Sequence, residues 1–242
     1  MMGQEKKPIE EVLDSLDGKK KIAVIGCGGC STVFHTGGIE EVNEMAETLT
    51  KQGKKVTPIG LPFAVFACYK PFSSMFVEKF KKDLKDCDAV LMMSCGDGLQ
   101  TVREILDEEL GVEKPIYPAT NAMGVSGGGP DKFIEKCQGC GDCVVGKTAG
   151  ICPLTECPKG LLNGPCGGTR QDGKCEVDPE KDCAWYLIYN RLKNIGELDK
   201  INNFVESHDW SKVTRPRVFE REPLDIHKHL GRTKEVIESL GI

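Results

Sequence analysis

The chain has 242 residues, of which 39% are hydrophobic and 29% are charged, and its formal net charge is −5. Because thirteen cysteines count toward the hydrophobic share, the apolar supply for a core is thinner than that figure indicates. Interspersed charges leave no broad basic face, which argues against nucleic acid as a partner. No secretory signal is visible and no apolar run approaches the roughly 20 residues that span a bilayer, so we expect a cytoplasmic protein.

Short apolar runs and amphipathic stretches alternate through the first half. The runs have the length of buried strands, at residues 21–26, 55–60, 89–94 and 115–119. The stretches have helical spacing, at residues 38–53, 73–85 and 97–111, and the first ends at a glycine that suits a helix C-terminus. Strand and helix in alternation predict an α/β fold with a doubly wound, mostly parallel, Rossmann-like sheet.

The composition changes after Asn121, where a glycine-rich connector leads into a cysteine-rich segment. We therefore predict an α/β domain over residues 1–130 and a small Cys-rich metal-cluster domain over residues 131–195. A helical and polar tail follows over residues 196–242, with a final short helix near residues 233–240. The tail is a candidate docking region for a partner.

The glycines after the first predicted strand do not form a dinucleotide fingerprint. Ser31 stands where the third glycine would be, and the second strand ends without the acidic residue that would hold a ribose. Gly26 and Gly28 instead flank Cys27 and Cys30, a C-x-x-C pair at the carboxyl end of a strand. Open parallel sheets place their ligand sites at that edge, so the pair is a metal or redox position.

Two further cysteines are expected at the same edge. Cys95 follows the third predicted strand, and Cys68 lies in the loop after the second. Four thiolates are the usual ligands of iron–sulfur clusters and of structural zinc. The alternative is that Cys68 and Cys95 are buried small residues while Cys27 and Cys30 form a thiol redox pair.

The second half carries a stronger signal. Cys137, Cys140 and Cys143 have the C-x2-C-x2-C spacing that opens a bacterial ferredoxin motif, but the next Cys-Pro, at Cys152, follows after eight residues and not three. The segment from Cys137 to Cys183 has few large apolar side chains, so it needs cross-links to stabilise its fold. Because disulfides are rare in a reducing compartment, bound metal is the expected cross-link.

Five cysteines remain for the triplet's fourth ligand and a further set of four: Cys152, Cys157, Cys166, Cys175 and Cys183. Spacing leaves their grouping open, and it leaves zinc open as the occupant of one set. With the sheet-edge site, the expected cofactors are two or three 4Fe–4S clusters, with one zinc in place of a cluster as the variant. No flavin is expected on this chain.

The other chemistry-bearing residues give weaker signals. Cys87 has no glycine or nearby thiol beside it and is expected to pack as a small hydrophobe. His35 could serve the Cys27 and Cys30 pair, although a solvated or packed side chain is the simpler interpretation for it and for His208. No catalytic triad, paired carboxylates, zinc-protease motif or P-loop is legible, so no independent active site is predicted.

The eight cysteines from Cys137 to Cys183, with Trp185 in "CAWYLIYNRL", resemble the C-terminal domain family of methylenetetrahydrofolate reductase. Residues 20–130, with "GCGGCSTVFHTGG" and "SCGDGLQTV", also look like the first half of the small, flavin-free iron–sulfur subunit of the acetogen-type enzyme. The likeness covers most of the chain, and the long cysteine string is its specific part.

This resemblance implies a partner, a flavin-bearing catalytic subunit that reduces 5,10-methylenetetrahydrofolate to 5-methyltetrahydrofolate in one-carbon metabolism or the methyl branch of acetate formation. The chain would be a non-catalytic subunit that relays electrons to that flavin, with further electron-donor subunits in the complex. A hypothesis of another class is a zinc-stabilised scaffold or regulatory subunit of a one-carbon complex, which moves no electrons.

Overall fold

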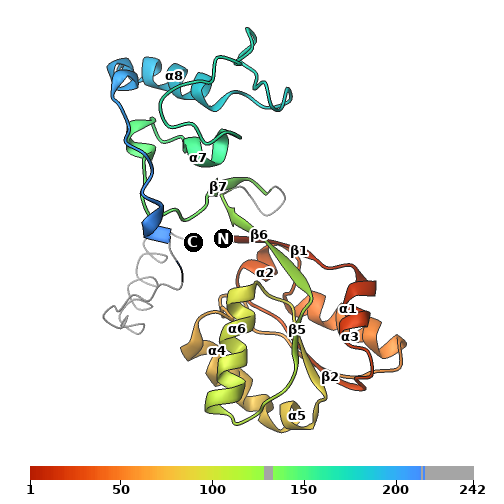
Figure 1. Cartoon of the computed structure of the whole chain (residues 1–242). Helices are drawn as coiled ribbons and strands as arrows, with labels where there is room; N and C mark the ends of the chain where they lie inside the picture. The colour runs from red at the N-terminus through yellow and green to blue at the C-terminus, as the bar shows by residue number, and fades with distance from the viewer. Residues whose placement is uncertain (128–132, 214, 216–242) are drawn as a thin grey trace, which may run out of the picture. The chain divides into compact units, whose positions relative to one another are not determined.

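The computed structural model describes residues 1–127, 133–213 and 215 (Figure 1). Its larger sheet is parallel throughout and has the strand order β3-β2-β4-β5. The strands are β2 (Lys21–Ile25), β3 (Lys55–Ile59), β4 (Ala89–Met92) and β5 (Ile116–Pro118). All four predicted strands are therefore confirmed, each within a few residues of its expected ends.

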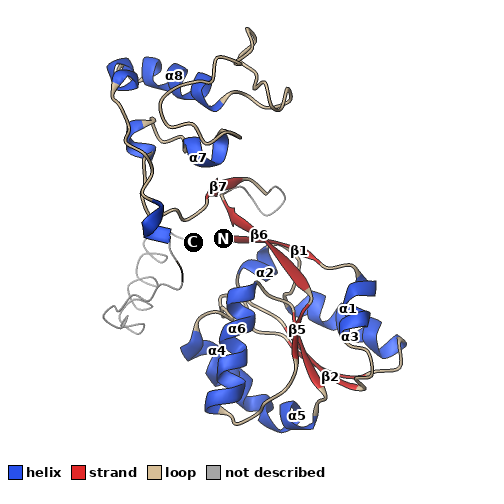
Figure 2. Ribbon diagram, viewed as in Figure 1, coloured by secondary structure: helices blue, strands red, loops and turns tan. Residues whose placement is uncertain are grey.

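Alternate residues of these strands pack into two separate cores, because successive side chains of a strand point to opposite faces. Val24 and Leu91 pack on one face with residues of α1 (Ile9–Ser15) and α3 (Ile39–Lys51). Ile25 and Met92 pack on the other face with α4 (Lys70–Val77), α5 (Lys81–Asp86) and α6 (Gly96–Glu104). Figure 2 shows helices on both sides of the sheet, as a doubly wound fold requires.

The predicted helices form, in shorter pieces than the spacing alone indicates. The stretch at 38–53 is α3, which ends before Gly53, a residue with φ of +79°. The stretch at 73–85 divides into α4, a 3-10 turn (Glu78–Phe80) and α5. The stretch at 97–111 begins as α6 and continues as a π-helical turn (Ile105–Glu109). A four-residue helix, α2 (Cys30–Val33), begins at the second cysteine of the C-x-x-C pair of Cys27 and Cys30.

A second, antiparallel sheet was not predicted. Its order is β1-β6-β7, with β1 (Met2–Lys6), β6 (Thr120–Ser126) and β7 (Glu135–Cys137). The glycine-rich connector predicted after Asn121 is thus wrong in part, because residues up to Ser126 form β6. Its main partner is the N-terminal strand β1, more than a hundred residues away, and a local sequence pattern carries no sign of such a pairing.

The cysteine-rich segment has a small apolar core of its own. Trp185, Ile188 and Leu192 of α8 (Ala184–Asn194) are buried, and Ile151 and Leu161 pack against them. The other helical pieces of the segment are short: α7 (Pro153–Glu156) and a 3-10 turn at Val145–Lys147. Two further 3-10 turns come later in the chain, at Leu198–Asn202 and Trp210–Val213. Most of this core therefore comes from the helix that follows the last cysteine, and little from the segment between the cysteines.

The chain divides into two compact units. The larger comprises Met1–Gly139 and Cys143–Ser207, and the smaller comprises Cys140–Asp142 and the residues from His208 onward. The domain boundaries predicted at residues 130 and 195 stay predictions. The helix predicted near residues 233–240 and most of the predicted docking tail lie outside the described residues. Within the described ranges, no helix has the length and apolar character needed to span a membrane.

Gly28 lets the loop after β3 pack directly against the end of β2. Its N–H donates to the Val65 carbonyl at 3.0 Å, and its own carbonyl accepts from the N–H of Ala64 at 2.8 Å. A Cβ at residue 28 would overlap the carbonyl oxygen of Pro62. The loop that leads to Cys68 can approach Cys27 because no side chain stands between the two backbones.

Gly28→Ala should therefore destabilise the chain by about 1–3 kcal/mol, the usual cost of overpacking where backbone must move. Gly96→Ala is the matched control, because nothing lies within 4 Å of a Cβ at that position and alanine favours the helix. Urea denaturation followed by circular dichroism measures both changes. Equal stability of the two variants would contradict the packing described here.

Candidate metal centres

Three of the predicted ligands come from loops at one edge of the parallel sheet. Cys27 follows β2, Cys68 follows β3, and Cys95 is the residue before α6, directly after β4. These three strands are neighbours and parallel, so their carboxyl ends meet at the same edge. The strand order therefore brings the loops that carry Cys27, Cys68 and Cys95 to one edge, while their convergence on a metal stays a prediction.

The electrostatics of these thiols show that they share an environment. Burial raises the pKa of the Cys68 thiol to about 11, although the residue as a whole is exposed, and the negative charge of Asp97 is the next cause. Ionised Cys95 and Cys27 act on Cys68 in the same direction. Burial also raises the pKa of Cys95, which the backbone N–H of Gly98 partly offsets. In the metal-free chain, Cys68 and Cys95 therefore stay protonated at neutral pH.

Each sulfur of the C-x-x-C pair accepts a hydrogen bond from a backbone N–H group. The N–H of Ala67 donates to Cys27 Sγ at 3.4 Å, and the N–H of Met2 donates to Cys30 Sγ at 3.3 Å. Cys30 is thus held by the start of β1, a contact with the N-terminal strand that was not predicted. Charges couple Cys27, Cys68 and Cys95 to one another, whereas Cys30 is placed by this separate hydrogen bond.

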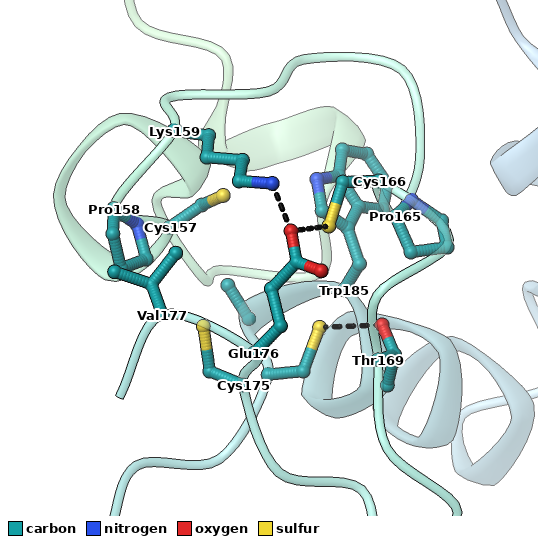
Figure 3. Close-up of a pocket in the computed structure, with 12 residues that line it drawn as sticks. Cys157, Pro158, Lys159, Pro165, Cys166, Thr169, Cys175, Glu176, Val177 and Trp185 are labelled. Carbon is teal, nitrogen blue, oxygen red and sulfur yellow. Dashed lines mark hydrogen bonds and ion pairs between the residues drawn. The ribbon is translucent and has the colours of Figure 1, made fainter. Parts of the chain in front are cut away.

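A second group of thiols lines a pocket in the cysteine-rich segment (Figure 3). Four of its lining residues are cysteines, spread over 27 positions of the chain: Cys157, Cys166, Cys175 and Cys183. The apolar part of the lining includes Val177 and Trp185. Sequence spacing had left these four among five candidates, and the pocket separates them from Cys152.

Three polar residues that line this pocket were not predicted: Lys159, Thr169 and Glu176. Glu176 accepts hydrogen bonds from the Lys159 ammonium and from the Cys166 thiol, the latter at 3.3 Å (Figure 3). Thr169 Oγ1 lies 3.1 Å from Cys183 Sγ. The pKa of Glu176 is lowered, chiefly by the Lys159 hydrogen bond. Only the adjacency of Glu176 to Cys175 in the sequence could have pointed to it.

The remaining cysteines lie elsewhere. Cys137 is the last residue of β7, and its Sγ accepts from the N–H of Gly139 at 3.4 Å. Cys152 precedes α7, and Cys143 is exposed. In the smaller unit, Cys140 Sγ lies 3.8 Å from the carbonyl oxygen of Asp142. The grouping of the triplet stays a prediction.

Among the described residues, which include all thirteen cysteines, no three His, Cys, Asp or Glu side chains stand close enough together to hold a metal ion. Both sites supply thiols, the usual ligands of iron–sulfur clusters and common ligands of structural zinc. The sulfurs would have to move toward one another on binding. The predicted ligands and cofactors thus remain predictions, with the pocket and the sheet edge as their locations.

Cys87 packs apart from the thiol sites, whereas His208 Nε2 lies 3.4 Å from the backbone carbonyl oxygen of Cys140. Cys87 is 5% exposed, belongs to the core beside α5, and donates to the Leu84 carbonyl at 3.2 Å. His35 is largely exposed, with its Nδ1 3.5 Å from the Glu41 carboxylate. His208 is buried against Trp210. Cys87 is therefore suited as a control position for every experiment on the other cysteines.

The raised pKa of Cys68 predicts slow alkylation. In the reduced, metal-free chain at pH 8, the folded protein should hold about a hundredfold less Cys68 thiolate than the urea-unfolded protein, since the pKa is about 11 against an ordinary 9.0. Asp97→Asn should speed the reaction, because it removes a charge that raises this pKa. Mass spectrometry of the peptide containing residue 68 measures the iodoacetamide rate. Equal rates for folded and unfolded chains would contradict the described environment.

Comparison with known proteins gives one match. A family model described as "Methylene-tetrahydrofolate reductase C terminal" matches residues 117–211. No curated protein and no solved structure matches the chain. The matched range includes Trp185 and all eight cysteines of the cysteine-rich segment. This finding associates that segment with methylenetetrahydrofolate reductase.

Proposed function

We propose that the chain is the iron–sulfur electron-transfer subunit of a methylenetetrahydrofolate reductase complex. It relays electrons to a flavin on a separate catalytic subunit, which reduces 5,10-methylenetetrahydrofolate to 5-methyltetrahydrofolate. The observation that carries the proposal is the pocket lined by Cys157, Cys166, Cys175 and Cys183, inside the range that the family model matches. Other subunits of the complex would supply the electrons.

The pocket suits a bound cluster in more than its thiol content. Trp185 is 5% exposed and lines the pocket, so one wall of the pocket is a buried aromatic side chain. Thr169 offers a hydroxyl beside Cys183, and Lys159 brings a positive charge near the thiols. A bound cluster would supply one-electron transfer, and hydrogen bonds and burial of this kind tune its reduction potential.

The sheet edge is the second location for a cluster in this proposal. Cys27, Cys68 and Cys95 supply thiols there, and Cys30 would join them. Because metal binds thiolates, loading this site would release protons from Cys68 and Cys95, whose pKa values are raised in the metal-free chain. N–H groups such as that of Ala67 already point at the sulfurs, and they would go on to stabilise their negative charge.

The direct test is electron transfer to a flavoprotein. The chain, purified anaerobically, reduced with dithionite and freed of excess reductant, should bleach the visible absorbance of the flavoprotein that copurifies with it from its host. Chelator-treated chain is the negative control, and the Cys87→Ala variant should act like the wild type. A colourless chain that binds the flavoprotein without reducing its flavin would favour the zinc-stabilised scaffold instead.

Metal removal should loosen the cysteine-rich segment before the α/β sheet. The sheet packs large cores on both faces, whereas the cysteine-rich segment has only the small cluster around α8. The chain has two tryptophans, so Trp210→Phe leaves Trp185 as the reporter. After chelation, Trp185 emission should shift to the red while most of the helical circular dichroism remains. Simultaneous loss of both signals would contradict this order.

A further inference from the structure

We infer that Cys157, Cys166, Cys175 and Cys183 are the ligands of one metal site, and that the Glu176 carboxylate leaves the pocket when metal binds. The identity of the metal rests on the proposed function, whereas the ligand set does not. Spacing alone allows five different sets of four among the last five cysteines. The structure selects one of them, because these four line a common pocket and Cys152 does not.

Backbone hydrogen bonds bring two of the ligands together without any metal. Lys174 and Asp182 form an antiparallel bridge that closes the loop between Cys175 and Cys183. The N–H of Cys175 donates to the Lys181 carbonyl at 2.9 Å, and the N–H of Cys183 donates to the Gly173 carbonyl at 2.8 Å. Cys175 and Cys183 are therefore held on the two facing sides of one loop.

The loop that carries Cys157 and Cys166 is hydrogen-bonded to α8, the helix that follows Cys183. Cys157 ends α7, and its carbonyl accepts from the N–H of Gly160 at 2.9 Å. The next residue along, Leu161, accepts a hydrogen bond from Trp185 Nε1 at 2.9 Å. Trp185 lies in the first turn of α8, two residues after Cys183. The loop between Cys157 and Cys166 is thus held against the helix that begins at the fourth ligand.

Glu176 explains why the four sulfurs do not already converge. Its carboxylate accepts from the Cys166 thiol and from Lys159, and it lies so close to Gly168 that a Cβ there would overlap it (Figure 3). It therefore takes up space between the thiols. Once the thiols ionise around a metal, a carboxylate among them meets like charges, and its departure relieves that repulsion. Lys159 then faces the thiolates directly.

The number of cysteines in the segment also assigns a second ligand set. With four of the five later cysteines assigned, Cys152 is the one left to complete the set of Cys137, Cys140 and Cys143. This step follows from the number of thiols and not from their placement. It predicts that the two sets load and lose metal independently.

The test is the metal content of cysteine variants of the full chain, purified anaerobically and assayed for iron, zinc and acid-labile sulfide. Each of Cys157→Ser, Cys166→Ser, Cys175→Ser and Cys183→Ser should lose the same share, about four irons with their sulfides or about one zinc. A double variant within the set should lose no more than a single one, whereas adding Cys140→Ser should remove a second share. Cys87→Ser is the matched control and should lose none.

The variant Glu176→Gln tests whether the Glu176 carboxylate binds the metal or moves away when the metal binds. Because the carboxylate is not a ligand in this account, the variant should keep the full metal content. Loss of the set's metal in Glu176→Gln would overturn the displacement, and additive losses within the four cysteines would overturn the ligand set.

A measurement on the wild-type chain tests the same ligand set if the cysteine variants fail to fold. In the metal-loaded protein, the four thiols should resist alkylation together and become reactive together as chelator removes the metal. Full reactivity of any one of them before chelation would overturn the inference. Zinc released from the set, with no iron, would leave the ligand set standing while the proposed electron relay fails. If the chain holds iron but the four cysteine variants lose different amounts of it, the electron relay would stand while the ligand set fails.

Discussion

The shortage of apolar side chains between Cys137 and Cys183 governs the second half of the molecule. Ile151 and Leu161 are among the few residues of that segment that reach a core, and the core itself is built by Trp185, Ile188 and Leu192 of the following helix. So small a cluster gives limited hydrophobic stabilisation to a long loop-rich segment. Metal bound by the thiols would supply cross-links that the hydrophobic effect cannot.

The sheet-edge thiols obey a different constraint. The parallel strands bury residues on both faces, so their fold needs no metal, and the strand order alone brings the loops of Cys27, Cys68 and Cys95 to one edge. Gly28 permits the close contact between two of these loops. One chain thus offers thiols in two settings, the edge of a sheet that packs without metal and a segment whose order would depend on its ligand.

Sequence patterns predicted what is local or periodic. The buried runs gave the four parallel strands, and Cys87 packs in the core as expected of an isolated cysteine. The β1 and β6 pairing was missed because it joins residues at opposite ends of the α/β region. The separation of Cys157, Cys166, Cys175 and Cys183 from Cys152 was also out of reach. It depends on a loop closed by backbone bonds and on Trp185 binding Leu161, neither of which spacing encodes.

In the proposed function, these thiols hold iron–sulfur clusters. Iron and acid-labile sulfide, counted per chain on anaerobically purified protein, test it most directly. Clusters at the sheet edge and in both cysteine-rich sets predict about twelve irons with as many sulfides, and zinc in one set leaves about eight. A chain with near-zero iron, whatever its zinc content, would contradict the account.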